Sequence, residues 1–313
     1  MTAPMTETEA PMIARSPLCF LRALVLSALA LAALVPPAWA EMQEVRLGDR
    51  FYLIDLPAAP EGAPLILALH GGGGDPAQFA RASGLGDAAT ARGYAVVFPA
   101  GSSRRGGDRL LTWNGGYCCG HAARKGVDDI GFLEKVVADT GRRFGLDTTR
   151  VFATGMSNGA ILAETLAARN PGLIRAVSGV SGTMDTRTTR VMGPVPALII
   201  HGTADPMVPY GGGVGEDSLT RTDFAPVQAV VKAFLVPWGG GIHAVSRTLD
   251  RFDDGTSVRI ADYSLKGRVV LRLITVEGGA HHWPGGRKAR QSDGKTQEID
   301  ANREILRFFD QVR

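Results

Sequence analysis

The chain has 313 residues, an apolar content of 45% and a formal net charge of +3. This length and apolar content can bury a full core, so one large α/β domain is expected rather than two small ones. The near-neutral balance includes no basic tract, which argues against a nucleic-acid partner because phosphate binding needs clustered Lys and Arg.

The first forty residues have the pattern of an export signal. Two arginines flank an apolar run at 23–35 that ends in small residues, so we expect a signal peptide at 1–40, cleavage after Ala40 and a single α/β domain at 41–313. Acidic residues near the start suggest that translation begins at Met12. The apolar run is too short to span a bilayer, and we expect a secreted protein, periplasmic or extracellular, with no membrane span after cleavage.

Apolar runs alternate with helical spacings through the rest of the chain. Strands are expected at 51–57, 64–70, 94–98, 151–153, 174–180, 197–201, 257–263 and 269–276. Helices are expected at 80–92, from 128 or 129 to about 144, at 161–167, at 226–234 and at 299–312. This βαβα rhythm predicts an α/β class with a mostly parallel central sheet flanked by helices.

The segment Gly155-Met-Ser-Asn-Gly159 follows a short apolar strand and precedes a helical pattern. A nucleophile elbow needs a serine on a strained strand-to-helix turn, and glycines on either side let the neighbouring backbone pack there. This context predicts Ser157 as a nucleophile. The alternative is an ordinary glycine-rich turn.

The strand at 64–70 ends in four glycines, 71–74. Acyl transfer needs backbone N–H groups that bind the developing oxyanion, and glycines let a substrate carbonyl approach them. We expect the N–H groups of Gly72 and Asn158 to form the oxyanion hole. A phosphate-binding loop is the rival interpretation, but no Lys-Ser/Thr follows.

An acid and a base follow the nucleophile in the order of the α/β-hydrolases. Asp205 comes directly after the strand at 197–201, where it is either the residue that orients a histidine or a turn residue before Pro206. His281 and His282 follow the last strand, and both could act as the base. Adjacent histidines point apart and lack carboxylate or cysteine partners at ligand spacing, so we expect no metal site and no cofactor.

Several polar residues have simpler roles. Asp128 or Asp129 is expected to cap the following helix, although a catalytic role for either is an alternative. Cys118 and Cys119 could form a disulfide or pack as two thiols, and the sequence leaves both open. The remaining histidines are expected to be structural or exposed: His70, His121, His201 and His243.

Six segments together resemble the polyhydroxybutyrate depolymerase and feruloyl/acetylxylan esterase family of secreted α/β-hydrolases. They lie at 69–71, 113–120, 127–132, 155–159, 201–205 and 281–285. The resemblance implies that His281 is the base, that His282 is the variable residue and that Trp283 is a wall of the site. The chain departs from the family pattern at Ala280, where glycine is usual, and at Gly72, where depolymerases often carry cysteine.

The expected activity is hydrolysis of carboxylic esters, of either the hydroxybutyrate-oligomer or the feruloyl/acetyl-polysaccharide type, through an acyl-enzyme. Trp113 and Trp283 are expected to line the substrate site. An acyltransferase that passes the acyl group to a sugar or lipid alcohol is the main alternative, and a non-catalytic binding protein is a second. The oligomeric state is left open.

Overall fold

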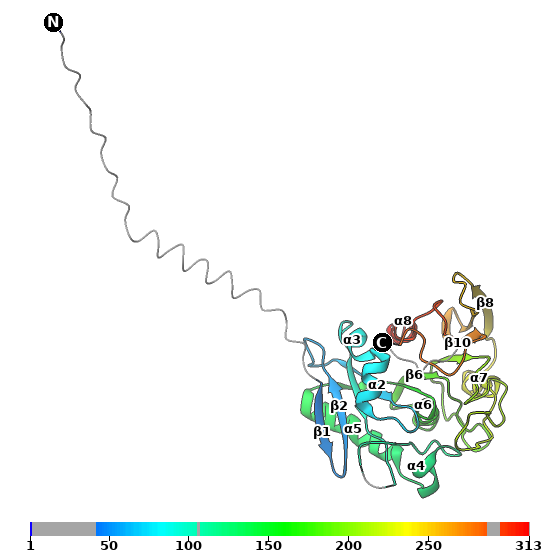
Figure 1. Ribbon diagram of the computed structural model, residues 1–313, viewed down its shortest axis with the longest axis horizontal. Coiled ribbons are helices and arrows are strands. Elements are labelled where there is room, and N and C mark those ends of the chain that lie inside the picture. The colour runs from blue at the N-terminus through cyan, green and yellow to red at the C-terminus, as the bar shows by residue number, and fades with distance from the viewer. Residues whose placement is uncertain (2–41, 105–106, 287–294, 313) are drawn as a thin grey trace. The chain divides into compact units, whose positions relative to one another are not determined.

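The fold of the unit Met42–Arg313 is known from a computed structural model, which describes residues 1, 42–104, 107–286 and 295–312 of the chain (Figure 1). The expected export signal lies outside the described residues, apart from Met1. Within these ranges, no helix combines the length and the apolar character that crossing a bilayer requires.

The described residues contain one ten-stranded sheet with the strand order β1-β2-β4-β3-β5-β6-β7-β10-β9-β8. The six central strands, β4-β3-β5-β6-β7-β10, pair in parallel. The outer strands β1 and β2 at one edge, and β9 and β8 at the other, pair antiparallel. The central strands are buried on both faces, which explains their continuous apolar runs. The strand bounds are β1 Gln43–Leu47, β2 Arg50–Asp55, β3 Pro64–Leu69, β4 Ala95–Pro99, β5 Asp147–Met156, β6 Ile174–Val180, β7 Ala197–Gly202, β8 His243–Leu249, β9 Ser257–Leu265 and β10 Arg268–Glu277.

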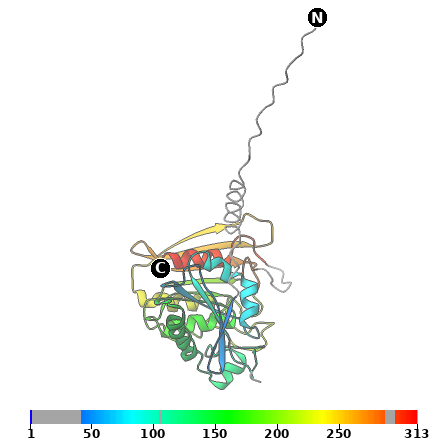
Figure 2. The same cartoon turned by 90° about the vertical axis from the view of Figure 1, so that its left-hand side faces the viewer.

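Helices cover both faces of the sheet. One face packs against α5, α6 and α7, and the other packs against α2, α3 and α8. Figure 2 shows the red helix α8 on one side of the sheet and the green helices α5 and α6 on the other side. The helix bounds are α2 Pro76–Ser83, α3 Leu85–Thr90, α4 Gly120–Lys125, α5 Asp129–Phe144, α6 Asn158–Arg169, α7 Val227–Leu235, the 3₁₀ turn η1 Val236–Trp238, and α8 Ala301–Asp310.

Five elements differ from the sequence-based expectation. The single helix expected at 80–92 is two helices, because Gly84 adopts φ 63° and ends α2 with a left-handed cap. The short helix α4 lies in a stretch where neither a helix nor a strand was expected. The outer strands β1 and β8 are largely exposed, so neither carries the apolar run that marked the central strands.

The two aspartates before α5 have different roles. Asp128 is the N-cap and accepts a hydrogen bond from the Gly131 N–H at 2.9 Å, as expected. Asp129 is buried, pairs with Arg50 at 2.8 Å and accepts the Asn114 N–H at 2.7 Å. Asp129 therefore anchors the loop that precedes α4 and does not cap the helix.

Candidate active site

Ser157 lies on the tight turn between β5 and α6. Its backbone has φ 56° and ψ −124°, a region that non-glycine residues rarely adopt. The flanking glycines make this turn possible, because a Cβ on Gly155 would lie 2.8 Å from the Leu69 carbonyl oxygen and a Cβ on Gly159 would overlap that atom. The strand, strained turn and helix of a nucleophile elbow are thus all present at Ser157.

Asp205 and His281 form a hydrogen-bonded pair. The His281 Nδ1 lies 2.8 Å from Asp205 Oδ2 and 3.0 Å from Oδ1. The Asp205 carboxylate is fully buried and also accepts the backbone N–H groups of Met207 and Val208, each at 2.9 Å. These contacts fix the carboxylate in the loop after β7, so that it faces the loop after β10.

The electrostatics of Asp205 favour its charged form. Burial acts to raise the pKa of Asp205, but the hydrogen bond and charge of His281, with smaller contributions from His201 and the Val208 N–H, outweigh burial and lower it. An ionised carboxylate accepts the Nδ1–H of His281, which leaves Nε2 as the proton-accepting nitrogen. This is the tautomer that a general base requires.

Ser157, Asp205 and His281 follow β5, β7 and β10, which run parallel within the order β5-β6-β7-β10. The carboxyl ends of these strands therefore bring the three residues to one edge of the sheet. Among the described residues, the Ser157 hydroxyl and the His281 Nε2 each lack a hydrogen-bond partner, including each other. In unliganded enzymes this catalytic bond is often long and tightens only with substrate.

The expected oxyanion donors lie beside Ser157. A Cβ added to Gly72 would lie 3.4 Å from the Asn158 Cβ, and a Cβ added to Gly71 would lie 3.6 Å from the Ser157 Cβ. The next glycine N–H along the loop is occupied, since Gly73 donates to the Leu111 carbonyl at 2.8 Å. Within the described chain, the N–H groups of Gly72 and Asn158 have no protein acceptor, so both are free to bind a ligand oxygen.

The two tryptophans lie deeper than expected. Trp113 has no exposed surface, and its indole N–H donates to the His70 carbonyl at 2.9 Å. Trp283 is 6% exposed, donates to Asn302 Oδ1 at 3.1 Å and packs edge-on against Phe79. A fully buried indole cannot contact substrate, so the structure replaces the substrate-lining prediction for Trp113 with a core position. Trp283 is largely core as well.

The neighbouring histidines are engaged elsewhere. His282 Nδ1 lies 3.1 Å from the Ala280 carbonyl, and its Nε2 lies 3.4 Å from the Thr296 N–H, so the two adjacent imidazoles have separate partners. His201 is buried and donates from Nε2 to the Val208 carbonyl at 2.8 Å, while burial lowers its pKa. His201 therefore supports the loop that carries Asp205.

Cys118 and Cys119, whose pairing the sequence left open, are joined by a disulfide. Cys118 is buried in a small apolar cluster with Ile161, Val208 and Phe224. In the part of the chain that the structure describes, no group of three or more His, Cys, Asp or Glu side chains is arranged to hold a metal ion.

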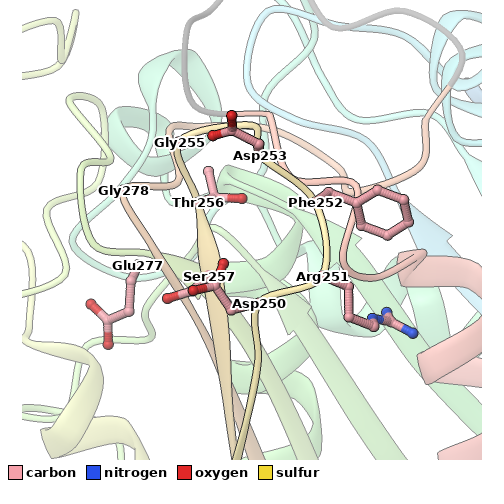
Figure 3. A pocket seen from close by; sticks show the side chains of 9 residues that line it. All are labelled: Asp250, Arg251, Phe252, Asp253, Gly255, Thr256, Ser257, Glu277 and Gly278. Carbon is pink, nitrogen blue, oxygen red and sulfur yellow. The ribbon is translucent and has the colours of Figure 1, made fainter.

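A polar cavity of about 640 Å³ opens at the carboxyl end of β10, shortly before the His281 loop (Figure 3). The carboxylates of Asp253 and Glu277 lie at opposite ends of this cavity, with Thr256 and Ser257 between them. None of the three residues expected to be catalytic lines it. The cavity is therefore a neighbour of the candidate active site and not its centre.

Comparison with known proteins places this geometry in context. The sequence profile of the family described as "Esterase PHB depolymerase" matches residues 50–206. The chain is 30% identical to "Putative esterase NocK" of Nocardia uniformis subsp. tsuyamanensis, over 74% of this chain and 68% of that protein. It is 27% identical to "Probable feruloyl esterase C" of Aspergillus clavatus, over 60% of this chain and 71% of that protein.

The solved structure of an acetyl xylan esterase from Aspergillus awamori superposes with a TM-score of 0.56. The superposition covers 87% of this chain and 100% of that chain, at 16% identity. At this identity the likeness concerns the fold alone. Together with the mostly parallel sheet between two helical layers, it confirms the predicted α/β-hydrolase fold.

Proposed function

Because this chain belongs to the esterase PHB depolymerase family and is a hydrolase of carboxylic esters, we propose that it acts through a covalent acyl-enzyme on Ser157. The observation that carries this proposal is the buried Asp205–His281 pair, at the same sheet edge as a serine on a strained turn. The resemblance drawn from the sequence motifs led to the same three residues.

In the proposed first step, Ser157 Oγ attacks the ester carbonyl carbon while His281 Nε2 takes the hydroxyl proton. Asp205 stabilises the imidazolium that forms, because its carboxylate already accepts the Nδ1–H. The tetrahedral oxyanion binds the N–H groups of Gly72 and Asn158 more tightly than the ground-state carbonyl does, which lowers the barrier. Protonated His281 then donates its proton to the leaving alcohol.

In the second step, His281 removes a proton from water, which attacks the acyl carbon, and the protonated His281 then gives that proton to Ser157 Oγ as the acyl bond breaks and the acid is released. The residues that take part supply a nucleophile, a base and an electrostatic site. The proposed mechanism therefore uses no metal ion or organic cofactor.

The proposed substrates are esters of polysaccharides, feruloyl or acetyl, or of 3-hydroxybutyrate oligomers. The feruloyl and acetyl xylan esterases among its relatives and structural neighbours support the first class, and the family description supports the second. The polar cavity beside the His281 loop suits an alcohol portion rich in hydroxyl groups. A panel of feruloyl, acetyl-sugar and 3-hydroxybutyrate-oligomer esters, compared by kcat/KM, ranks them.

We also propose that residues 1–40 direct export and that residues 41–313 are the mature catalytic domain. The charged and apolar pattern of that segment supports this. Sequencing the N-terminus of the protein recovered from the periplasm or medium should find Glu41 first. A mature protein that keeps residue 2 or residue 12 would contradict the assignment.

The proposed nucleophile is tested by Ser157→Ala. We expect kcat for a nitrophenyl ester to fall about 10⁴-fold or more, with no change in thermal unfolding, because the nucleophile is lost and no packing changes. The matched control is Ser246→Ala on the exposed strand β8, which should keep full activity. A fluorophosphonate should label the wild type and Ser246→Ala stoichiometrically but not Ser157→Ala. Hydrolysis retained in Ser157→Ala would reject the mechanism.

A further inference from the structure

The two backbone groups proposed to bind the oxyanion are held by a buried network that the mechanism itself does not use. The network begins at His70, which is 1% exposed and directly precedes the glycine loop. Its Nε2 lies 3.0 Å from the Gly101 N–H, and its Nδ1 lies 2.9 Å from the Gly71 carbonyl oxygen. Since an N–H cannot accept a hydrogen bond, Nε2 must carry the lone pair and Nδ1 the proton.

The protonation state of His70 agrees with this arrangement. Burial lowers the pKa of His70 to about 4, against the smaller opposing effect of its hydrogen bond to Gly71. The imidazole is therefore neutral near pH 7. Gly101 packs against the ring so closely that a Cβ there would lie 3.1 Å from Nε2 and 2.7 Å from the Thr112 carbonyl.

The contact with the Gly71 carbonyl determines where the next N–H points. The Gly71–Gly72 peptide is trans and planar, so its C=O and N–H point in opposite directions. The Gly71 oxygen accepts both His70 Nδ1–H and the Gly74 N–H, the latter at 3.1 Å. These two donors hold the carbonyl on the His70 side, so the Gly72 N–H points away from His70.

The second donor is tied to the same network through its own side chain. Asn158 Oδ1 accepts the Trp113 backbone N–H at 2.7 Å, and Asn158 Nδ2 donates to the Trp113 carbonyl at 3.0 Å. The Trp113 indole then donates to the His70 carbonyl at 2.9 Å. His70, Trp113 and Asn158 are each at least 98% buried. The loop after β3 and the first residue of α6 are thus joined by consecutive hydrogen bonds through Trp113.

We propose that His70 is a positioning residue for the oxyanion hole: its Nδ1–H orients the Gly71–Gly72 peptide, while Trp113 and the Asn158 side chain fix the distance between the two donors. This rests on the proposed function, since it concerns the same oxyanion. The expected consequence of losing His70 Nδ1–H is weaker transition-state binding with little effect on ground-state binding.

The test compares His70→Leu with His70→Asn. Both remove the acceptor for the Gly101 N–H, but the asparagine amide can still donate to the Gly71 oxygen, so the pair isolates that one hydrogen bond. We expect kcat to fall about 10- to 100-fold in His70→Leu with KM changed less than about threefold, and most of the loss to be recovered in His70→Asn. Ser83→Ala, which removes a buried hydroxyl bonded to the Phe79 carbonyl, controls for general loss of stability.

A thionoester substrate supplies a readout that simple destabilisation would not change. Its sulfur accepts hydrogen bonds weakly, so it gains little from the oxyanion hole. The ratio of ester to thionoester kcat/KM should therefore fall in His70→Leu by the same factor as kcat and return in His70→Asn.

If Ser157→Ala stays active, the proposed function fails. If Ser157 is essential but His70→Leu keeps the wild-type ratio, or His70→Asn is no better than leucine, the positioning role alone fails.

Discussion

Glu164 makes the stability of this protein depend on pH. It lies in α6, is 1% exposed, and its Oε2 accepts the Met184 N–H at 2.8 Å. Its other oxygen, Oε1, is buried without a hydrogen-bond partner. Burial raises the pKa of Glu164 to about 8, although the Met184 hydrogen bond opposes this rise. Near neutral pH the folded protein therefore holds a protonated carboxyl at this position.

The direction of the effect follows from proton linkage. Well below pH 4.5 the carboxyl is protonated in both the folded and the unfolded chain. From there to about pH 8, the unfolded chain releases this proton and the folded chain keeps it, so the free energy of unfolding falls as pH rises. A tenfold change in proton affinity corresponds to about 1.4 kcal/mol, so the upper limit of this fall is about 4–5 kcal/mol.

Glu164→Gln should remove this contribution, because the amide does not titrate. Its extra buried N–H donors cost about 1–3 kcal/mol at low pH, so the variant should be less stable than wild type near pH 5. That difference should shrink or reverse by pH 8. Urea unfolding of both proteins at pH 5, 6, 7 and 8 measures it, and subtraction cancels the groups that the two proteins share.

The exposed Glu216→Gln is the matched control and should run parallel to wild type at every pH. If the Glu164→Gln and wild-type curves were also parallel from pH 5 to pH 8, the inference that burial keeps this carboxyl protonated would be wrong.

Two further predictions concern the active site. Asp205→Asn should lower kcat about 10⁴-fold, because the amide stabilises the wrong tautomer of His281, whereas its fold should survive; near-normal turnover would place the orienting acid elsewhere. Gly159→Ala should lower the melting temperature by several degrees and abolish serine labelling, because its Cβ would overlap the Leu69 carbonyl oxygen. A variant that melts and reacts like wild type would show that the turn relaxes at no cost.

The central sheet could be predicted because its strands are buried on both faces and read as unbroken apolar runs, as at Pro64–Leu69 and Ala197–Gly202. The exposed outer strand His243–Leu249 has no such run, and its place follows from pairing with β9. The break at Gly84 depends on a left-handed backbone that sequence spacing does not reveal.

The positions of Ser157, Asp205 and His281 could be proposed from the sequence because each lies within four residues of the end of a strand, and parallel strands share an edge. The choice of His281 over His282 came from the family resemblance. The positions of the tryptophans could not, since an indole suits a substrate wall and a core equally well. The network around His70 was missed because its partners lie 31 and 43 residues away in the chain. Only the folded backbone brings them together.

The contact of Gly155 and Gly159 with the Leu69 carbonyl joins segments that are far apart in the sequence. The reactive conformation of the serine therefore depends on β3 having docked beside β5. A chain still being synthesised contains the hydroxyl but not the geometry that the proposed mechanism requires. Under the proposed mechanism, hydrolytic capacity thus arises only when the sheet is assembled.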